Sequence, residues 1–402
     1  MSTVDSPDYF AQSLEAHRKT QGKLEVASRM RVDSKDELSI AYTPGVARPC
    51  EVIGEDKSAA WDLTMKGRTV AVVSDGSAIL GLGNLGPEAA LPVMEGKAVL
   101  FKEFAGVDAV PVVLDAHEPD AIVAAVRAMA PTFGGINLED ISAPRCFEIE
   151  ERLQDVGIPV LHDDQHGTAI VLLAAVLNAV KAKGAYIGSQ KVVISGAGAA
   201  GRAIARLLTC VDNHDRCIPV ESVLICDSRG ILAPGRERQD PVKEELAQQT
   251  NPGGRTGTLK DALQDADIFI GVSKGGLLTA DDIRTMAKDP IVLAMANPDP
   301  EILPAEAEAG GAFVVGTGRS DFPNQVNNVL AFPGLFRGAL EARATCFTNA
   351  MKFAAVEAIA ECVIEPTPHR ILPSPFDRSV ASRVASAVAE AARAGGVCAD
   401  QG

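Results

Sequence analysis

A glycine-rich segment in the middle of the chain has the spacing that binds the pyrophosphate of a dinucleotide. It follows an apolar run at 191–195, precedes a helical pattern at 202–208, and its candidate contacts are Gly196, Gly198, Ala199, Ala200 and Gly201. Glycines in this order allow a tight turn and place a helix N-terminus against the phosphates. A similar segment at 81–86 starts seven residues after its apolar run and is followed by proline, so we assign it to a substrate-domain loop.

The residues after the next apolar run concern the choice of cofactor. Asp227 ends that run, 26 residues past Gly201, and is a candidate for binding the ribose hydroxyls of NAD. Three arginines follow it, Arg229, Arg236 and Arg238, which could accept the 2′-phosphate of NADP or could belong to a solvated loop. The sequence leaves NAD and NADP both open.

Carboxylates cluster at two places in the first half of the chain. Glu139 and Asp140 form one pair, and Asp164 lies in the acidic run at 162–166. Carboxylate and water are the ligands that Mg²⁺ and Mn²⁺ prefer, although the spacing alone rather favours solvated loop acids. His162 and His166 are four residues apart, but we expect Gly167 to break the helix, and therefore expect structural histidines and not a zinc site.

Two further residues could transfer protons. Lys97 leads an otherwise apolar run, where burial would lower the pKa of its ammonium group. Tyr42 lies in the turn at 41–47 and is one of only three tyrosines. From the sequence alone, each of these two residues could equally be an ordinary core or surface residue without a role in proton transfer.

The elements that must position these residues form two α/β blocks. Apolar runs at 68–74, 109–114 and 157–162 predict buried strands, and 167–183 predicts a long helix. In the second block, runs at 191–195, 222–226, 267–271, 290–295 and 312–315 alternate with helical stretches, which predicts a doubly wound parallel sheet. We expect two consecutive α/β domains: 1–184 for substrate and metal, and 185–402 as a Rossmann-type domain with two C-terminal helical stretches separated by the proline-rich turn at 365–375.

Composition excludes several classes of protein. The 402 residues carry a net charge of −15 and no basic run, so binding to nucleic acid or to an anionic membrane is not expected. The longest apolar stretch, 169–177, is too short to span a bilayer, and the first residues do not resemble a signal peptide. Eight cysteines without a C-x-x-C pair indicate reduced thiols in a cytoplasmic enzyme.

These motifs together resemble the malic enzyme family, in its compact bacterial form without a C-terminal phosphotransacetylase-like domain. The resemblance covers the chain from Tyr42 to about Arg343. Its motifs occur in family order at 41–45, 81–86, 96–97, 138–140, 163–168, 196–201, 296–298 and 318–328. Larger members have an arginine ahead of the second motif, and residues 77–80 contain none, which leaves open how the substrate carboxylates are held.

The resemblance implies roles for individual residues. Tyr42 would be the general acid and Lys97 the general base. Glu139, Asp140 and Asp164 would bind Mg²⁺ or Mn²⁺. Asn297 and Asn328 would contact the substrate carboxylates, and Asn297 would also face the cofactor.

The implied reaction is oxidative decarboxylation of L-malate to pyruvate and CO₂ by a homodimer or higher homo-oligomer with NAD or NADP. Two other classes share part of the pattern. A 2-hydroxy-acid or amino-acid dehydrogenase would use the same Rossmann half but needs no metal. A non-catalytic nucleotide-sensing protein would keep the glycine-rich segment and dispense with Lys97 and Tyr42.

Overall fold

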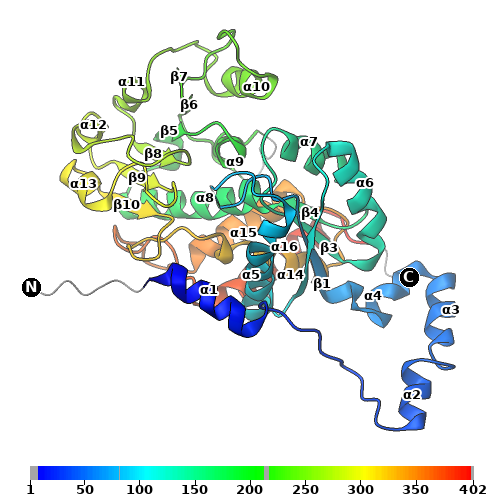
Figure 1. Cartoon of the computed structure of the whole chain (residues 1–402). Coiled ribbons are helices and arrows are strands. Elements are labelled where there is room, and N and C mark those ends of the chain that lie inside the picture. Colours follow the sequence, from blue (N-terminus) through cyan, green and yellow to red (C-terminus); the bar gives the residue numbers. More distant parts are fainter. Residues whose placement is uncertain (1–7, 81, 212–216, 400–402) are drawn as a thin grey trace, which may run out of the picture.

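The computed structural model describes residues 8–80, 82–211 and 217–399, which form two α/β layers joined by helices (Figure 1). The first sheet has the order β2-β1-β3-β4, and all of its pairs are parallel. Its strands are β1 (Thr69–Ser74), β2 (Asp108–Val113), β3 (Gly135–Leu138) and β4 (Val160–His162). The carboxyl ends of β3 and β4 therefore lie next to each other, directly before the two groups of carboxylates.

The second sheet has the order β10-β9-β8-β5-β6-β7. Its strands are β5 (Lys191–Ser195), β6 (Ser222–Asp227), β7 (Gly230–Ile231), β8 (Ile268–Gly271), β9 (Ile291–Ala294) and β10 (Val314–Thr317). All pairs are parallel except the short β6–β7 pair. The strand order reverses between β5 and β8, and this switch point is where open α/β sheets bind ligands.

Sixteen α-helices occur in the described ranges. Those of the first half are α1 (Tyr9–Thr20), α2 (Lys35–Ala41), α3 (Ala47–Glu55), α4 (Ala60–Leu63), α5 (Pro87–Ala105), α6 (Pro119–Met129), α7 (Arg145–Arg152) and α8 (Asp163–Lys183). Those of the second half are α9 (Ala199–Leu208), α10 (Pro241–Thr250), α11 (Leu259–Leu263), α12 (Ala280–Arg284), α13 (Pro304–Ala309), α14 (Phe332–Glu341), α15 (Asn349–Glu361) and α16 (Ser379–Ala394). Short 3₁₀ turns are η1 (Lys57–Ala59), η2 (Met65–Arg68), η3 (Ala130–Thr132), η4 (Ile187–Ser189) and η5 (Asn328–Leu330).

One hydrophobic core links the two sheets. It contains Val70 and Val72 of β1, Ile194 of β5, nearly all of the middle of α8, and the apolar faces of α5 and α14 to α16. Edge-to-face aromatic contacts join α5 to α14, because the ring of Phe101 lies 4.7 Å from that of Phe332. The C-terminal helices thus pack on the first sheet as well as the second, and the domain boundary at 184/185 stays a prediction.

Helix α8 is long and apolar enough, by length and composition alone, to cross a membrane. Its most apolar window is 72% buried inside the protein, as expected for the core helix of a globular domain. The predicted helix at 167–183 begins four residues earlier than expected, at Asp163, and Gly167 lies inside it. The expectation that Gly167 breaks the helix was wrong.

The fold class predicted from the sequence is confirmed, with two local differences. Strands β3 and β7 were not predicted, because the four residues of β3 include the polar Asn137 and lack the alternation that marks a strand, and β7 has only two residues. The C-terminal tail forms three helices where two stretches were expected, because the chain turns between Ala342 and Thr348 before α15 starts with a capping box.

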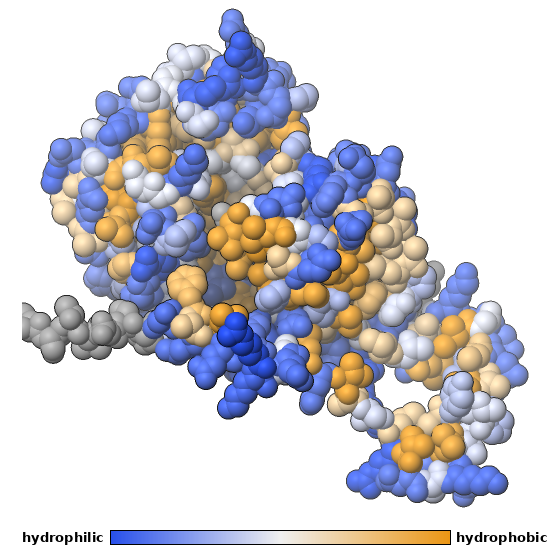
Figure 2. Space-filling view, viewed as in Figure 1, coloured by the Kyte–Doolittle hydropathy of each residue, from blue (hydrophilic) through white to orange (hydrophobic). Residues whose placement is uncertain are grey.

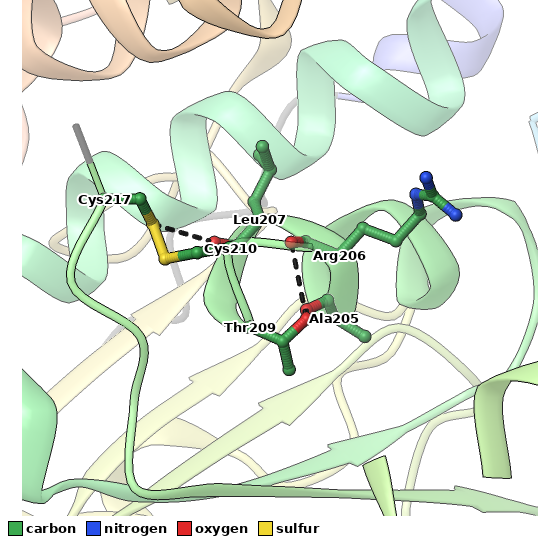
Figure 3. The surroundings of a disulfide bond; sticks show 6 residues. All are labelled: Ala205, Arg206, Leu207, Thr209, Cys210 and Cys217. Atoms are coloured by element: carbon green, nitrogen blue, oxygen red, sulfur yellow. Dashed lines mark hydrogen bonds between the residues drawn. A yellow bond between two sulfur atoms is a disulfide. The ribbon is translucent and has the colours of Figure 1, made fainter. Parts of the chain in front are cut away.

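A disulfide joins Cys210 to Cys217, so the prediction that all eight cysteines are reduced was wrong (Figure 3). Cys210 follows α9 in a left-handed conformation with φ +57°, and the returning chain brings the two Cα atoms within 5.7 Å. A spacing of seven residues matches no cysteine motif, which is why the pair was not predicted. The other six cysteines are free.

Candidate active site

Lys97 lies buried between two carboxylates at the carboxyl ends of β3 and β4. Its Nζ is 2.6 Å from Oδ2 of Asp163 and 2.9 Å from Oε1 of Glu139, and its side chain is 9% exposed. The ammonium group also lies 4.1 Å from the ring centre of Phe332 at the start of α14. Helix α5 therefore delivers a single cation into a closed acidic site.

The pKa of Lys97 is raised, contrary to the expectation from its apolar neighbours. Burial by itself lowers this pKa, but the charges of Asp163 and Glu139 and the hydrogen bond to Asp163 outweigh burial. The apolar run around Lys97 is evident in the sequence. Its contacts with the two carboxylates are not, because Glu139 and Asp163 lie 42 and 66 residues further along the chain. In this structure Lys97 is a protonated partner of the acidic cluster.

Glu139, Asp140 and Asp164 form a group of carboxylates that could hold a metal ion. One oxygen of each lies within 4.8 Å of the others. Asp140 adopts a left-handed conformation, with φ +53°, and its backbone N–H donates to Oδ2 of Asp164 at 2.9 Å. Its own Oδ2 is buried without a hydrogen-bond partner in the part of the chain that the structure describes. The loop after β3 is thus bent so that adjacent carboxylates meet Asp164 at the start of α8.

The electrostatics of this group fit a divalent cation. Burial raises the pKa of Glu139 well above its usual range, and neighbouring carboxylates add to the effect against the opposing charge of Lys97. Burial and the charge of Asp164 raise the pKa of Asp140 to about 7. Oxygen ligands with this excess of negative charge suit Mg²⁺ or Mn²⁺, which would relieve the repulsion.

Metal binding is accordingly expected to weaken as the pH falls below about 7. A proton competes with the cation for Asp140, so the affinity for Mn²⁺ should fall about tenfold per pH unit below the pKa and level off above it. Proton uptake by Glu139 would make the fall steeper. Calorimetric titration with Mn²⁺ between pH 5.5 and 8.5 measures this, and an affinity that does not change over that range would contradict it.

Asp163 belongs to the acidic run at 162–166, but the sequence predicted no role for it. Its carboxylate is fully buried, binds Lys97, and accepts a hydrogen bond from Nδ2 of Asn328 at 3.2 Å. Asn328 in turn accepts from the Thr168 hydroxyl at 3.1 Å. Adjacent residues at a helix start point about 100° apart, so Asp163 faces Lys97 while Asp164 faces Asp140. Only the observed start of α8 reveals this division.

Gly167 makes room for the Asp163 carboxylate. A Cβ atom at position 167 would lie 1.9 Å from Oδ1 of Asp163, one helical turn earlier. Gly167→Ala should therefore displace the carboxylate that holds Lys97 and lower kcat about 100-fold, as small misplacements in active sites do. Steady-state kinetics test this against the control Gly253→Ala, since nothing lies within 4 Å of a Cβ there. A near-normal kcat in Gly167→Ala would contradict it.

Glu150 holds the side chain of His166 and the backbone of His162, whereas both ring nitrogens of the buried His162 have no hydrogen-bond partner among the described residues and its Nε2 lies 3.6 Å from Oδ2 of Asp164. The buried Glu150 carboxylate accepts hydrogen bonds from the backbone N–H of His162 at 2.9 Å and from Gln165 at 3.0 Å, and pairs with Nε2 of His166 at 3.0 Å. Opposing its burial, the charges of His166 and Lys352 lower the pKa of Glu150 to about 2. Its role is to fix the start of α8.

The glycine-rich loop connects β5 to α9 at the switch point of the second sheet. Gly196 has φ +118°, and its N–H donates to the carbonyl of Cys226 at 2.8 Å. A Cβ on Gly201 would lie 1.9 Å from the carbonyl oxygen of Gly196, whereas a Cβ on Gly198 would have no protein atom within 4 Å. The first and third glycines therefore shape the loop, and the middle one leaves open space beside it.

The start of α9, directly after the glycine-rich loop, packs against the first α/β layer. Ala199 packs against the core on the far side of the first sheet, and the Arg202 guanidinium lies 4.8 Å from the ring centre of Phe147 on α7. Asn328 belongs to the acidic site, as described. Asn297 lies exposed beyond the carboxyl end of β9, and its side-chain amide faces Gly318, without a contact to Lys97 among the described residues.

Tyr42 lies away from this site. It follows α2, is 68% exposed, and its hydroxyl has no hydrogen bond in the described part of the chain. Figure 1 shows α2 and α3 projecting from the body, far from α5. A single copy of the chain therefore assembles Lys97, the carboxylates and Asn328 without Tyr42.

A glycine-rich loop at the switch point of one parallel sheet, together with a lysine and a group of carboxylates at the end of another, is typical of nicotinamide-dependent dehydrogenases that use a metal ion. Comparisons with known proteins give the family. The model described as "Malic enzyme, N-terminal domain" matches residues 21–119 and 116–154, and "Malic enzyme, NAD binding domain" matches 165–393. The chain belongs to the malic enzyme family, as its motifs predicted.

Individual relatives are similar over most of the chain. A bifunctional malic/malolactic enzyme of Bacillus subtilis (strain 168) is 57% identical over 390 residues, covering 96% of this chain and 93% of that protein. The crystal structure of NAD-dependent malic enzyme from Thermotoga maritima has 48% identity and a TM-score of 0.90, covering 94% of this chain and 98% of that one. Malic enzyme from Pyrococcus horikoshii has 47% identity and a TM-score of 0.92, covering 98% and 92%.

Proposed function

We propose that this chain oxidises and decarboxylates L-malate to pyruvate and CO₂, with NAD⁺ or NADP⁺ as the hydride acceptor and Mg²⁺ or Mn²⁺ as the required cation. The observation that carries the proposal is the position of Lys97, buried beside Glu139 in a group of carboxylates, in a chain whose glycine-rich loop leads to Ala199, packed against the core under β3. A base, a metal site and a dinucleotide site are what oxidation of a hydroxy acid followed by decarboxylation requires.

The chain's own residues divide the work. Lys97 would take the 2-hydroxyl proton at Nζ after losing its own proton, and Asp163 holds that nitrogen in place at 2.6 Å. A cation held by the neighbouring carboxylates would favour this loss, because it offsets the negative charge that raises the pKa of Lys97. Asn328, which is fixed by Asp163 and Thr168, and Asn297 at the end of β9 bind the substrate carboxylates. Glu139, Asp140 and Asp164 would hold the cation, which supplies positive charge to polarise the hydroxyl oxygen and to offset the carboxylates around Lys97. The loop at 196–201 would hold the cofactor, which supplies the hydride acceptor.

Proton transfer to C3 of the product needs an acid that one copy of the chain does not bring to its own site. We therefore propose a homodimer in which Tyr42 of each copy reaches the site of the other. The segment at 24–59, which we call the arm, carries Tyr42. Its base is tied to α5 by Lys23, whose Nζ donates to the Pro92 carbonyl at 2.6 Å, and it returns to the body near Asp62, which pairs with Arg343 at 2.6 Å.

The surface of the arm supports this assembly. Apolar side chains are exposed along it, as the orange patches on the projecting part of Figure 2 show; they are Leu24, Val26, Met30, Val32, Leu38, Ile40 and Val46. The loop before α5 also exposes Leu80, Leu82 and Leu85. Unpaired apolar surfaces of this kind mark protein interfaces, and two-fold symmetry would cover both surfaces in both copies at once.

Assays of malate with NAD⁺ and with NADP⁺, each with Mn²⁺ or Mg²⁺, test the proposed reaction. We expect malate-dependent cofactor reduction with formation of pyruvate, abolished by a chelator and restored by added Mn²⁺. Turnover that survives chelation would favour a plain 2-hydroxy-acid or amino-acid dehydrogenase. Nucleotide binding without any turnover would favour a sensing protein. A cytoplasmic location stays a prediction.

A further inference from the structure

The carboxylate of Asp227 is enclosed by the protein's own cations. Arg236 binds it through both terminal nitrogens, with Nη1 3.0 Å from Oδ1 and Nη2 2.6 Å from Oδ2. Nζ of Lys243, on α10, lies 3.3 Å from Oδ2, and the backbone N–H of Arg229 donates to Oδ1 at 2.9 Å. Two side-chain cations therefore converge on one anion.

These contacts leave no acceptor for a ribose. A carboxylate offers about four lone-pair positions, and four donors already occupy those of Asp227. Although burial opposes it, the hydrogen bonds from Arg236 and Arg229 lower the pKa of Asp227, so the group stays ionised and keeps its cations. An Asp227 that bound the two ribose hydroxyls of NAD would have to release one of these partners.

The place is the one where the adenosine ribose of a Rossmann cofactor lies. Asp227 directly follows Cys226, whose carbonyl accepts the N–H of Gly196 in the pyrophosphate-binding loop. Arg236 is further tied to the backbone carbonyls of Gly230 and Ile231 at 3.3 and 3.2 Å. Of the three arginines singled out in the sequence, only Arg236 turns its guanidinium to Asp227; that of Arg229 binds the carbonyls of Glu237 and Arg238.

We propose that Arg236 and Lys243 bind the 2′-phosphate of NADP, and that Asp227 is a positioning residue for these two cations and not the ligand of the ribose hydroxyls. Lys243 also lies 3.7 Å from Oδ2 of Asp240, so two carboxylates balance the two cations, and a phosphate would replace part of these contacts with its own charge-assisted hydrogen bonds to Arg236 and Lys243. The inference rests on the proposed dinucleotide-binding function and adds to it a preference for NADP over NAD.

Binding of nucleotide fragments tests the preference without any turnover. Adenosine 2′,5′-bisphosphate and AMP differ only in the 2′-phosphate, and calorimetry should show the bisphosphate binding at least about tenfold more tightly, as one or two charged hydrogen bonds provide. Lys243→Ala and Arg236→Ala should each remove most of this ratio while leaving the affinity for AMP nearly unchanged. Lys243, 30% exposed on a helix, can be replaced without disturbing the loop that Arg236 supports.

The control removes a similar charge at the amino end of the strands, opposite to the end at which Asp227 lies. Lys191, at the start of β5, is 48% exposed and lies 3.9 Å from Glu221, and Lys191→Ala should leave the ratio unchanged. An equal loss in this control, or wild-type binding of AMP as tight as that of the bisphosphate, would overturn the proposal.

Asp227→Asn separates the two roles of Asp227. It should lower the preference for the bisphosphate, because Arg236 and Lys243 lose the charge that holds them, and leave the affinity for AMP nearly unchanged. A ribose-binding Asp227 would lose AMP affinity instead, and that result would overturn the proposal. If neither nucleotide binds, the dinucleotide site is refuted together with the preference. Tight binding of the bisphosphate by a protein that does not turn over malate would uphold the preference and refute the proposed reaction.

Discussion

Mixing Lys97→Ala protein with Tyr42→Phe protein is expected to restore about one quarter of wild-type activity, although each variant alone should have less than about one hundredth. The reason is the placement of the two residues. Lys97 lies in the buried site of the body, and Tyr42 lies on the exposed arm outside it. If the arm serves the partner's site, a mixed dimer pairs the intact lysine of one copy with the intact tyrosine of the other.

The expected fraction follows from random pairing. Half of the dimers would be mixed, and each mixed dimer would have one site with both residues intact and one with neither. A quarter of all sites would therefore be complete, whereas a tyrosine acting within its own copy would give none. The two proteins need different affinity tags and must be co-expressed or refolded together, so that the copies exchange.

Two measurements make the result specific. Lys97→Ala mixed with Asp164→Ala is the matched control, because both residues lie in the body and no complete site can form in a mixed dimer. Exchange of the pyruvate methyl protons with D₂O should return in the first mixture and not in the control, since this step needs the acid at C3. Activity no higher than the sum of the two separate variants would contradict the exchange of arms.

The general architecture could be predicted from local patterns, because each of the five parallel strands of the second sheet is an apolar run. All five predicted strands of that sheet are present, and the glycine-rich segment lies between β5 and α9 as expected. These features depend on short stretches of chain, which one sequence displays directly. The family resemblance added the order of the motifs, and the comparisons confirm it.

The chemistry within the site depends on contacts between distant segments, and these were harder to predict. The charge state of Lys97 depends on Asp163 and Glu139, and a sequence shows neither distance. The role of Asp163 depends on the turn in which α8 starts. Gly167 was read as a helix breaker because glycine lowers helix propensity, whereas packing of the Asp163 carboxylate against it gives it a place inside the helix.

The position of Tyr42 shows a different limit. Its motif identifies it as a proton donor by resemblance, but a motif does not state which copy of the chain receives the residue. In the sequence, the apolar residues of the arm look like ordinary core residues. Their exposure could not be predicted, because it depends on the path that the chain takes after Lys23.

Gly198→Val is expected to weaken cofactor binding by at least about 100-fold while leaving the fold intact, since a branched side chain would occupy the space that the pyrophosphate must approach. The protein itself should accept the change. Gly198 has φ −91°, which valine adopts, and a Cβ there meets no protein atom within 4 Å.

Gly201→Ala should behave in the opposite way. Its Cβ would lie 1.9 Å from the Gly196 carbonyl oxygen, so the backbone of the loop must move and the protein should lose thermal stability as well as cofactor affinity. Gly253→Val is the control for Gly198→Val, because a Cβ at Gly253, on the turn after α10, also has no atom within 4 Å.

Thermal melts and fluorescence titration with NADPH and NADH separate these effects. Gly198→Val should have the melting temperature of the wild type and bind neither nucleotide. Gly253→Val should match the wild type in melting temperature and in nucleotide affinity. Gly201→Ala should have a lower melting temperature and a lower nucleotide affinity. Normal titration by a folded Gly198→Val protein would mean that the pyrophosphate does not pass this glycine. The open space at Gly198 would then have no ligand to explain it, and the cofactor would have to enter by another edge of the second sheet.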